Sequence, residues 1–141
     1  MRVENAIDIA ASAERVWELT IAVEEWPVIS PTMTTVERLG DEPMGIGSAA
    51  RVQQPAQPAR TWTVTTFVPL QCFAWTTTSR GVAITASHVL EPTATGVRNI
   101  LSVDVQGPLS WLVGPLVRRS ITKAIDTENR GFKRAADHEV S

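Results

Sequence analysis

The C-terminal part of the chain carries its longest amphipathic pattern. Between Leu109 and about Asp137, apolar residues recur at steps of three and four and so share one side of a helix: Leu109, Leu112, Val113, Leu116, Val117, Ile121, Ala124, Ile125 and Phe132. From Pro115 to Asp137 such a helix would be about 35 Å long. Gly114 and Pro115 predict a kink or a restart, because proline is tolerated in a first helical turn but not inside a helix. The pattern predicts a long helix that another layer must cover.

The rest of the chain has the alternation that is typical of strands. Val3, Ile7 and Ile9 predict an opening strand, and Ser12 is a good N-cap for a helix that would be followed by a second short helical turn. After Met33, β-branched and aromatic residues between Gly and Pro turns predict six more strands, over residues 34–39, 48–54, 60–68, 72–79, 82–90 and 97–106. We therefore expect an α+β fold in which a seven-stranded, curved antiparallel sheet wraps around the long C-terminal helix.

Period-two alternation also predicts which side chains point toward that helix. The inward sets are Trp62, Val64, Thr66 and Val68; Phe73, Trp75 and Thr77; Ile84, Ala86, His88 and Leu90; and Val97, Asn99, Leu101, Val103 and Val105. A hairpin through residues 91–96 that pairs Leu90 with Val97 also pairs His88 with Asn99. The two polar side chains are then expected to be neighbours on the concave face.

Composition restricts the function classes. A chain of 141 residues with 43% hydrophobic and 20% charged residues predicts one soluble domain over residues 1–141. The net charge of -2 gives no electrostatic reason to expect nucleic acid as a partner, and the basic residues after Arg118, interrupted by Asp126 and Glu128, are interpreted as the solvated face of the helix. No apolar run has the length of a signal peptide or a membrane span, which predicts a cytoplasmic protein. A homodimer is possible if Trp17, Trp26 or Trp111 reaches the surface.

The whole chain resembles the START-like, Bet v 1-like (SRPBCC) superfamily, and within it the bacterial polyketide cyclase/dehydrase and lipid-transport group. The resemblance rests on the strand-to-helix entry at residues 7–17, on Trp26-Pro27, Phe73-Ala74-Trp75 and Leu90-Glu91-Pro92 with Gly96, and on the ending at residues 129–133. It implies a helix-grip fold with a hydrophobic cavity between the sheet and the long helix. It carries over no catalytic motif residue by residue, and the superfamily hosts carriers, enzymes and binding domains.

The candidate ligand-binding residues are those expected to face this cavity. Large aromatic side chains around a few polar groups are typical of a small-molecule site, although the same wall could close as a packed core. The expected lining is Trp62, Val64, Thr66, Phe73, Trp75, Thr77, Ile84, His88, Asn99, Leu101, Val103, Leu116, Val117 and Ile121. The segments at residues 26–31 and 55–58 could form its mouth.

His88 is the one candidate catalytic residue, because an inward imidazole titrates near neutrality. The alternative is a neutral core histidine that is hydrogen-bonded to Asn99 or to a backbone carbonyl. Asn99, Thr66 and Thr77 could orient a ligand carbonyl or hydroxyl, or could satisfy one another.

Other chemistry finds no support in the sequence. The GxGxxA match at residues 45–50 leads into a strand, so it is interpreted as a turn, and there is no GxSxG or HExxH. The single cysteine, Cys72, excludes an internal disulfide and is expected on the face opposite Phe73, as an inert thiol. No inward carboxylate pair, metal site or cofactor is expected.

Three functions follow in order of preference. The first is binding of a small hydrophobic molecule, such as a lipid, polyketide or aromatic metabolite, in the cavity. The second is a metal-free enzyme of the cyclase/dehydratase type in which His88 moves a proton and Asn99 or a threonine holds an enolate oxygen, so that His88→Ala would abolish turnover and leave binding largely intact. The third is an interaction or regulatory module with a filled core.

Overall fold

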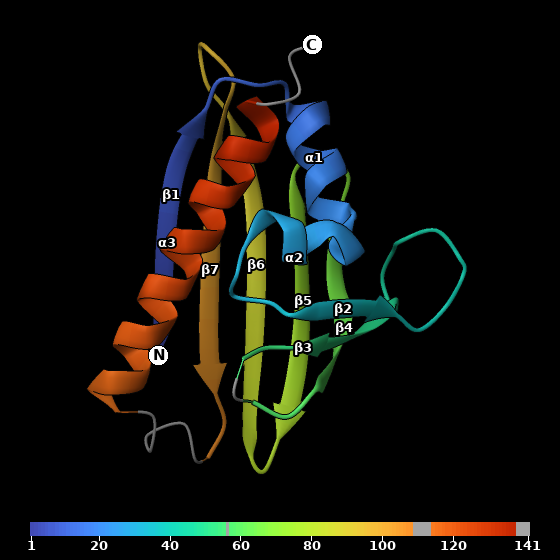
Figure 1. Cartoon of the computed structure of the whole chain (residues 1–141), viewed down its shortest axis with the longest axis vertical. Helices are drawn as coiled ribbons and strands as arrows, with labels where there is room; N and C mark the ends of the chain where they lie inside the picture. The colour runs from blue at the N-terminus through green and yellow to red at the C-terminus, as the bar shows by residue number, and fades with distance from the viewer. Residues whose placement is uncertain (56, 109–113, 138–141) are drawn as a thin grey trace.

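The structure is a computed structural model that describes residues 1–55, 57–108 and 114–137. One seven-stranded antiparallel sheet runs in the order β1-β7-β6-β5-β4-β3-β2. Its strands are β1 (Arg2–Ile9), β2 (Thr35–Arg38), β3 (Ala49–Gln53), β4 (Arg60–Val68), β5 (Cys72–Ser79), β6 (Val82–Pro92) and β7 (Val97–Gln106). The sheet curves, so that β2 and β3 cross in front of β4 and β5 in Figure 1. The predicted α+β helix-grip architecture is confirmed.

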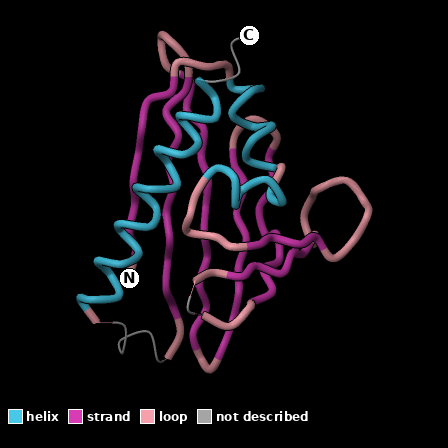
Figure 2. Tube along the Cα trace, viewed as in Figure 1, coloured by secondary structure: helices cyan, strands magenta, loops and turns pink. Residues whose placement is uncertain are grey.

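The helices lie on one face of the sheet, as the cyan segments of Figure 2 show. After β1 come α1 (Ala13–Ile21), a 3-10 turn η1 (Val23–Glu25) and the short α2 (Trp26–Ile29). The Ser12 hydroxyl accepts a hydrogen bond from the Arg15 backbone N–H at 3.1 Å, which confirms the predicted N-cap. Trp17 and Trp26 are buried, so the expectation that they could reach the surface is wrong. Trp111 lies outside the described residues.

The long helix α3 (Pro115–Asp137) begins at the proline that marked a restart in the sequence. Leu109, Leu112, Val113 and His138 lie outside the described residues. In Figure 1 the helix runs along β1 and β7, with α1 and α2 beside its C-terminal half. No helix in the described ranges is long and apolar enough to cross a membrane.

A β-bulge in β4 changes which of its residues face the helices. The register with β5 shifts between Val64 and Thr66, so Phe67 pairs with the inward Phe73, and Thr66 pairs with Ala74. An extra residue in one strand reverses the alternation beyond it. The expectation that Thr66 and Val68 point inward is therefore wrong, and Phe67 takes the inward position, with its ring 5.3 Å from that of Trp17.

The β6–β7 hairpin is two residues tighter than predicted. Pro92 pairs with Val97 and Leu90 with Asn99, so that His88 stands opposite Leu101. The predicted pairing of His88 with Asn99 is wrong, because β6 continues through Glu91 and Pro92 before the chain turns. The shift is an even number of residues, so the inward face of each strand is unchanged.

Candidate functional site

A pocket of about 460 Å³ lies between the concave face of the sheet and α3. Most of the predicted residues line it: Trp62, Trp75, Ile84, His88, Leu101, Val103, Leu116, Val117 and Ile121. The exposed surface of its wall is mainly apolar, because long aliphatic and indole side chains project from both layers. Leu116 on the first turn of α3 is 77% exposed, so the pocket is open beside the start of that helix.

The other predicted residues lie elsewhere. Val64 and Phe73 are buried in the hydrophobic core, deeper than the pocket wall, and Thr66 faces away from α3. Thr77 borders a different, larger hollow of about 690 Å³ near the ends of β4 and β5, whose wall is mostly threonine, serine and arginine. We regard the smaller pocket as the functional candidate, because the larger one lacks the apolar wall of a small-molecule site.

His88 is held inside a cluster of aromatic rings at the inner end of the pocket. Its ring stacks on that of Trp26 with centroids 5.0 Å apart, and the edges of Phe73 and Phe132 complete the enclosure. The residue is 4% exposed, and its Nδ1 has no hydrogen-bond partner among the described residues. Burial lowers the pKa of His88 to about 3, because an imidazolium would lose its hydration there. The histidine is therefore neutral at physiological pH.

Glu128 on α3 also lines the pocket, so its interpretation as part of the solvated face of the helix is wrong. Removal of its carboxylate from bulk water raises the pKa of Glu128 to about 7. No hydrogen bond or ion pair to this carboxyl occurs within the described part of the chain. A signal was present in the sequence: Ile121, Ile125 and Glu128 are separated by steps of four and three, which places the acid on the apolar stripe.

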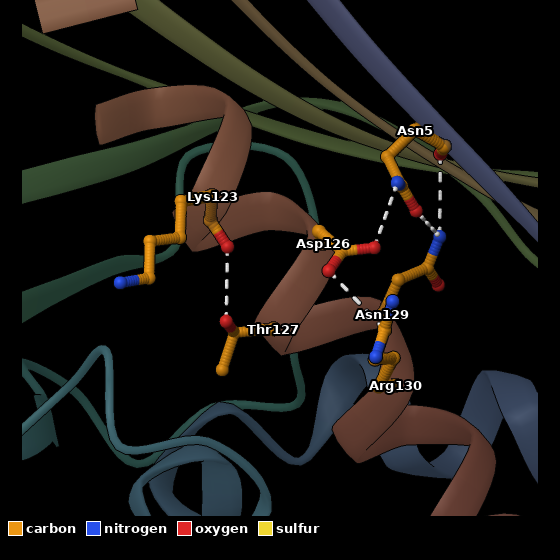
Figure 3. Close-up of polar contacts among 6 residues, drawn as sticks. All are labelled: Asn5, Lys123, Asp126, Thr127, Asn129 and Arg130. Carbon is orange, nitrogen blue, oxygen red and sulfur yellow. Dashed lines mark hydrogen bonds and ion pairs between the residues drawn. The ribbon is translucent and has the colours of Figure 1, made fainter. Parts of the chain in front are cut away.

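Asn99 binds the helix and is not free to orient a ligand. Its Nδ2 donates to Asn129 Oδ1 at 2.8 Å, and Asn129 Nδ2 donates in turn to Asn99 O at 3.0 Å and to Asn5 Oδ1 at 2.8 Å. Figure 3 shows Asn129 turned from α3 toward Asn5 on β1. Asn129 is fully buried, although it is a polar residue on a helix.

Several further residues complete the pocket wall. Trp26, Met33, Ala86, Ala124 and Ile125 contribute apolar surface, and Gln54 and Gln57 lie at the segment between β3 and β4. Trp26 is fixed by its indole N–H, which donates to Leu19 O at 3.1 Å. Sequence periodicity could not find Trp26, because its position depends on how a short helix packs and not on a long repeat.

The site offers little for metal or thiol chemistry. Within residues 1–55, 57–108 and 114–137, no group of three His, Cys, Asp or Glu side chains gathers as a metal site would require. Burial raises the pKa of the Cys72 thiol, which keeps it protonated and unreactive. The titratable side chains among the described residues of the pocket wall are His88 and Glu128.

Residues 1–137 match the family described as polyketide cyclase / dehydrase and lipid transport. No curated protein matches the chain. This family is the one that the sequence resembles at residues 7–17, at Phe73-Ala74-Trp75 and at residues 129–133.

Solved structures with low sequence identity share the fold. The aromatase/cyclase Zhui from a Streptomyces species has a TM-score of 0.75 and 19% identity, over 100% of this chain and 96% of that one. Ara h 8.0201 has a TM-score of 0.78 and 11% identity, over 99% of both chains. The di-domain ARO/CYC StfQ of the steffimycin pathway has a TM-score of 0.77 and 13% identity, over 97% of this chain and 50% of that one. At these identities the likeness concerns the fold alone.

Proposed function

Because this chain belongs to the polyketide cyclase / dehydrase and lipid transport family, we propose that it binds a small, predominantly apolar molecule between the sheet and α3. A lipid, a polyketide or an aromatic metabolite would suit the pocket. The observation that carries the proposal is the pocket of about 460 Å³ with a mainly apolar wall that opens beside Leu116.

Burial of apolar surface would supply the affinity. Two hundred Å² of ligand surface removed from water corresponds to about 5 kcal/mol at about 25 cal/mol per Å², before the entropic cost of binding. Trp62 and Trp75 contribute rigid surfaces, with ring centroids 5.7 Å apart. Rigid walls lose little side-chain entropy when a ligand enters, so more of this energy remains as affinity.

A catalytic role for His88 has weaker support than a binding role. With a pKa of about 3, the imidazole is a poor proton acceptor at neutral pH. Asn99, the partner proposed for an enolate oxygen, is engaged with Asn129. The open pocket in turn weighs against the interaction module with a filled core.

The test is to fill the pocket with a side chain. Ala124 lines the pocket on α3, whereas Ala94 lies exposed in the turn between β6 and β7. We expect the neutral dye Nile red to bind the wild type and the Ala94→Phe control with similar fluorescence enhancement. Ala124→Phe should weaken binding by about tenfold or more, which corresponds to the loss of about 1.4 kcal/mol of contact.

Two results would contradict the proposal. One is an absence of dye binding by a folded wild-type protein. The other is equal binding by Ala124→Phe and the wild type, which would place the dye outside the pocket. Native mass spectrometry of the purified protein, followed by extraction of any co-purifying molecule, would then identify the natural ligand.

A further inference from the structure

Glu128 is the only residue with a formally charged side chain among the described residues that line the pocket. No lysine or arginine accompanies it, and its carboxyl has no partner among the residues that the structure describes. An acid without a partner in an apolar pocket lowers the stability of the fold, because its desolvation is not compensated unless a ligand forms a hydrogen bond with it. Its position therefore carries information about the ligand.

We propose that Glu128 makes the pocket selective for an uncharged ligand that carries a carbonyl or a similar hydrogen-bond acceptor. Ligands with a carboxylate should bind poorly. This inference rests on the proposed binding function and narrows it. It separates neutral ketones, esters and quinones from fatty-acid anions, which an apolar pocket alone would not distinguish.

The position of Glu128 on α3 is suited to this role. The residue follows Ile121, Ala124 and Ile125 along the pocket side of the helix, one turn beyond Ile125, while Asp126 faces the other way and accepts a hydrogen bond from Asn5. An acid on this side borders the space that a ligand would occupy. In its protonated form it offers one O–H donor and one carbonyl acceptor.

A ligand carboxylate would meet an unfavourable environment. It would lose hydration on entering the apolar pocket and would find no cation there to replace it. Where Glu128 is ionised, the two negative charges repel each other, and where Glu128 is protonated, the ligand still lacks a counter-charge. His88 does not compensate, because its buried ring is neutral.

A ligand carbonyl avoids these costs. It brings no charge to desolvate and accepts a hydrogen bond from the protonated carboxyl. The raised pKa of Glu128, about 7, agrees with a group that is readily protonated when a neutral ligand displaces water. A ligand ammonium group could pair with the carboxylate, but it would also have to lose its hydration, which a ketone does not.

The experiment compares ligands that differ in one group on the same ring system. Binding of 1-acetylpyrene, pyrene-1-carboxylate and pyrene-1-methylamine to the full chain is measured by quenching of tryptophan fluorescence at pH 7. For the wild type we expect the ketone to bind about tenfold tighter than the carboxylate, the scale expected of an uncompensated charge.

Variants assign that preference to one side chain. Glu128→Gln keeps a hydrogen-bond donor and should retain the ketone while binding the carboxylate more tightly than the wild type does. Glu128→Leu removes the donor and should bind the ketone several-fold more weakly. Glu14→Gln makes the same charge change at an exposed site and should leave all three affinities unchanged.

The outcomes separate the two proposals. If Nile red enters the wild type but the carboxylate binds as tightly as the ketone, the ligand class is overturned and the pocket stands. If the amine binds most tightly and Glu128→Gln abolishes that binding, the pocket takes cations and the inference is wrong. If neither Nile red nor any of the pyrenes binds, the binding function and the ligand class both fail.

Discussion

Asn129 connects α3 to both strands that it crosses. Its amide donates to Asn5 on β1 and to the Asn99 backbone on β7, and its oxygen accepts from the Asn99 side chain. Because Asn99 and Asn129 are both fully buried, the groups through which they bind each other could not turn to water if the partner were removed. At the scale of single residues, this amide fixes the position of the helix over the sheet.

We expect Asn129→Leu to lower the free energy of unfolding by about 2–4 kcal/mol, because it leaves polar groups of the buried Asn99 without a partner and also removes the hydrogen bonds to Asn5. Urea denaturation followed by tryptophan fluorescence measures the change. Thr127 provides a control, since its hydroxyl donates only to Lys123 O within the same helix (Figure 3). Thr127→Ala should change stability by less than about 0.5 kcal/mol. Equal effects of the two substitutions would contradict the anchoring role.

The residue scale also shows what could be predicted. Alternation along β6 and β7 correctly predicts that His88 and Asn99 point inward, because that rule needs only near neighbours. It could not find the partner of Asn99, which lies thirty positions away on another element. Glu128 is polar and was therefore interpreted as part of the solvated face, although the helical spacing places it with Ile121 and Ile125.

At the scale of elements, α2 and α3 are in close contact at Gly131. This glycine is buried inside α3, where a Cβ atom would overlap the backbone oxygen of Ile29 at the end of α2. The close approach lets Phe132 reach the ring of Trp26, with centroids 6.0 Å apart. The inner end of the pocket depends on that contact, because Trp26 in turn stacks on His88.

Gly131→Ala tests this packing. Alanine would stabilise an isolated helix by about 1 kcal/mol relative to glycine. Here we expect a net destabilisation of about 1–3 kcal/mol, because the added methyl group pushes α3 away from α2. Gly114 provides the matched control, since a Cβ there meets nothing within 4 Å. If thermal denaturation showed that Gly131→Ala stabilises the protein, the helices would not be in close contact.

Element boundaries followed from local signals, and register did not. Alternation predicted the opening strand, and Gly and Pro turns predicted the other six, because such residues end strands for local reasons. The bulge in β4 lacks such a signal, because Thr65 and Thr66 look alike in sequence; the shift places Phe67 against Trp17, a contact between distant parts of the chain. Thr66 was therefore assigned to the site by a rule that holds only for an uninterrupted strand.

At the scale of the whole molecule, the pocket arises from the unequal attachment of α3. Its C-terminal half is held by Asn129, Gly131 and Phe132, whereas Leu116 and Val117 near its start remain exposed. The sheet and the helix thus separate toward one end, and the two titratable side chains of the pocket face the space between them. Burial shifts the pKa values of these two groups in opposite directions, down for His88 and up for Glu128.

These two groups should have opposing effects on stability between pH 4.5 and 6.5. Below pH 6.5 the unfolded chain protonates His88 while the folded protein does not until about pH 3, so this residue destabilises the fold as pH falls. Glu128 is protonated in the folded protein below about pH 7 but in the unfolded chain only near pH 4.5, so it stabilises the fold as pH falls. In the wild type the two effects partly cancel.

Single variants should separate them, in urea denaturation at pH 7.5, 6.5, 5.5 and 4.5. Relative to the wild type, Glu128→Gln should lose stability as pH falls, by up to about 1.4 kcal/mol per pH unit, because only the histidine remains. His88→Phe should gain stability relative to the wild type as pH falls over the same range. The slope due to Glu128 should be the smaller one, since water in the open pocket still solvates part of its carboxylate. Parallel curves for all three proteins would mean that neither side chain is desolvated, and would remove the electrostatic basis for selection of a neutral ligand.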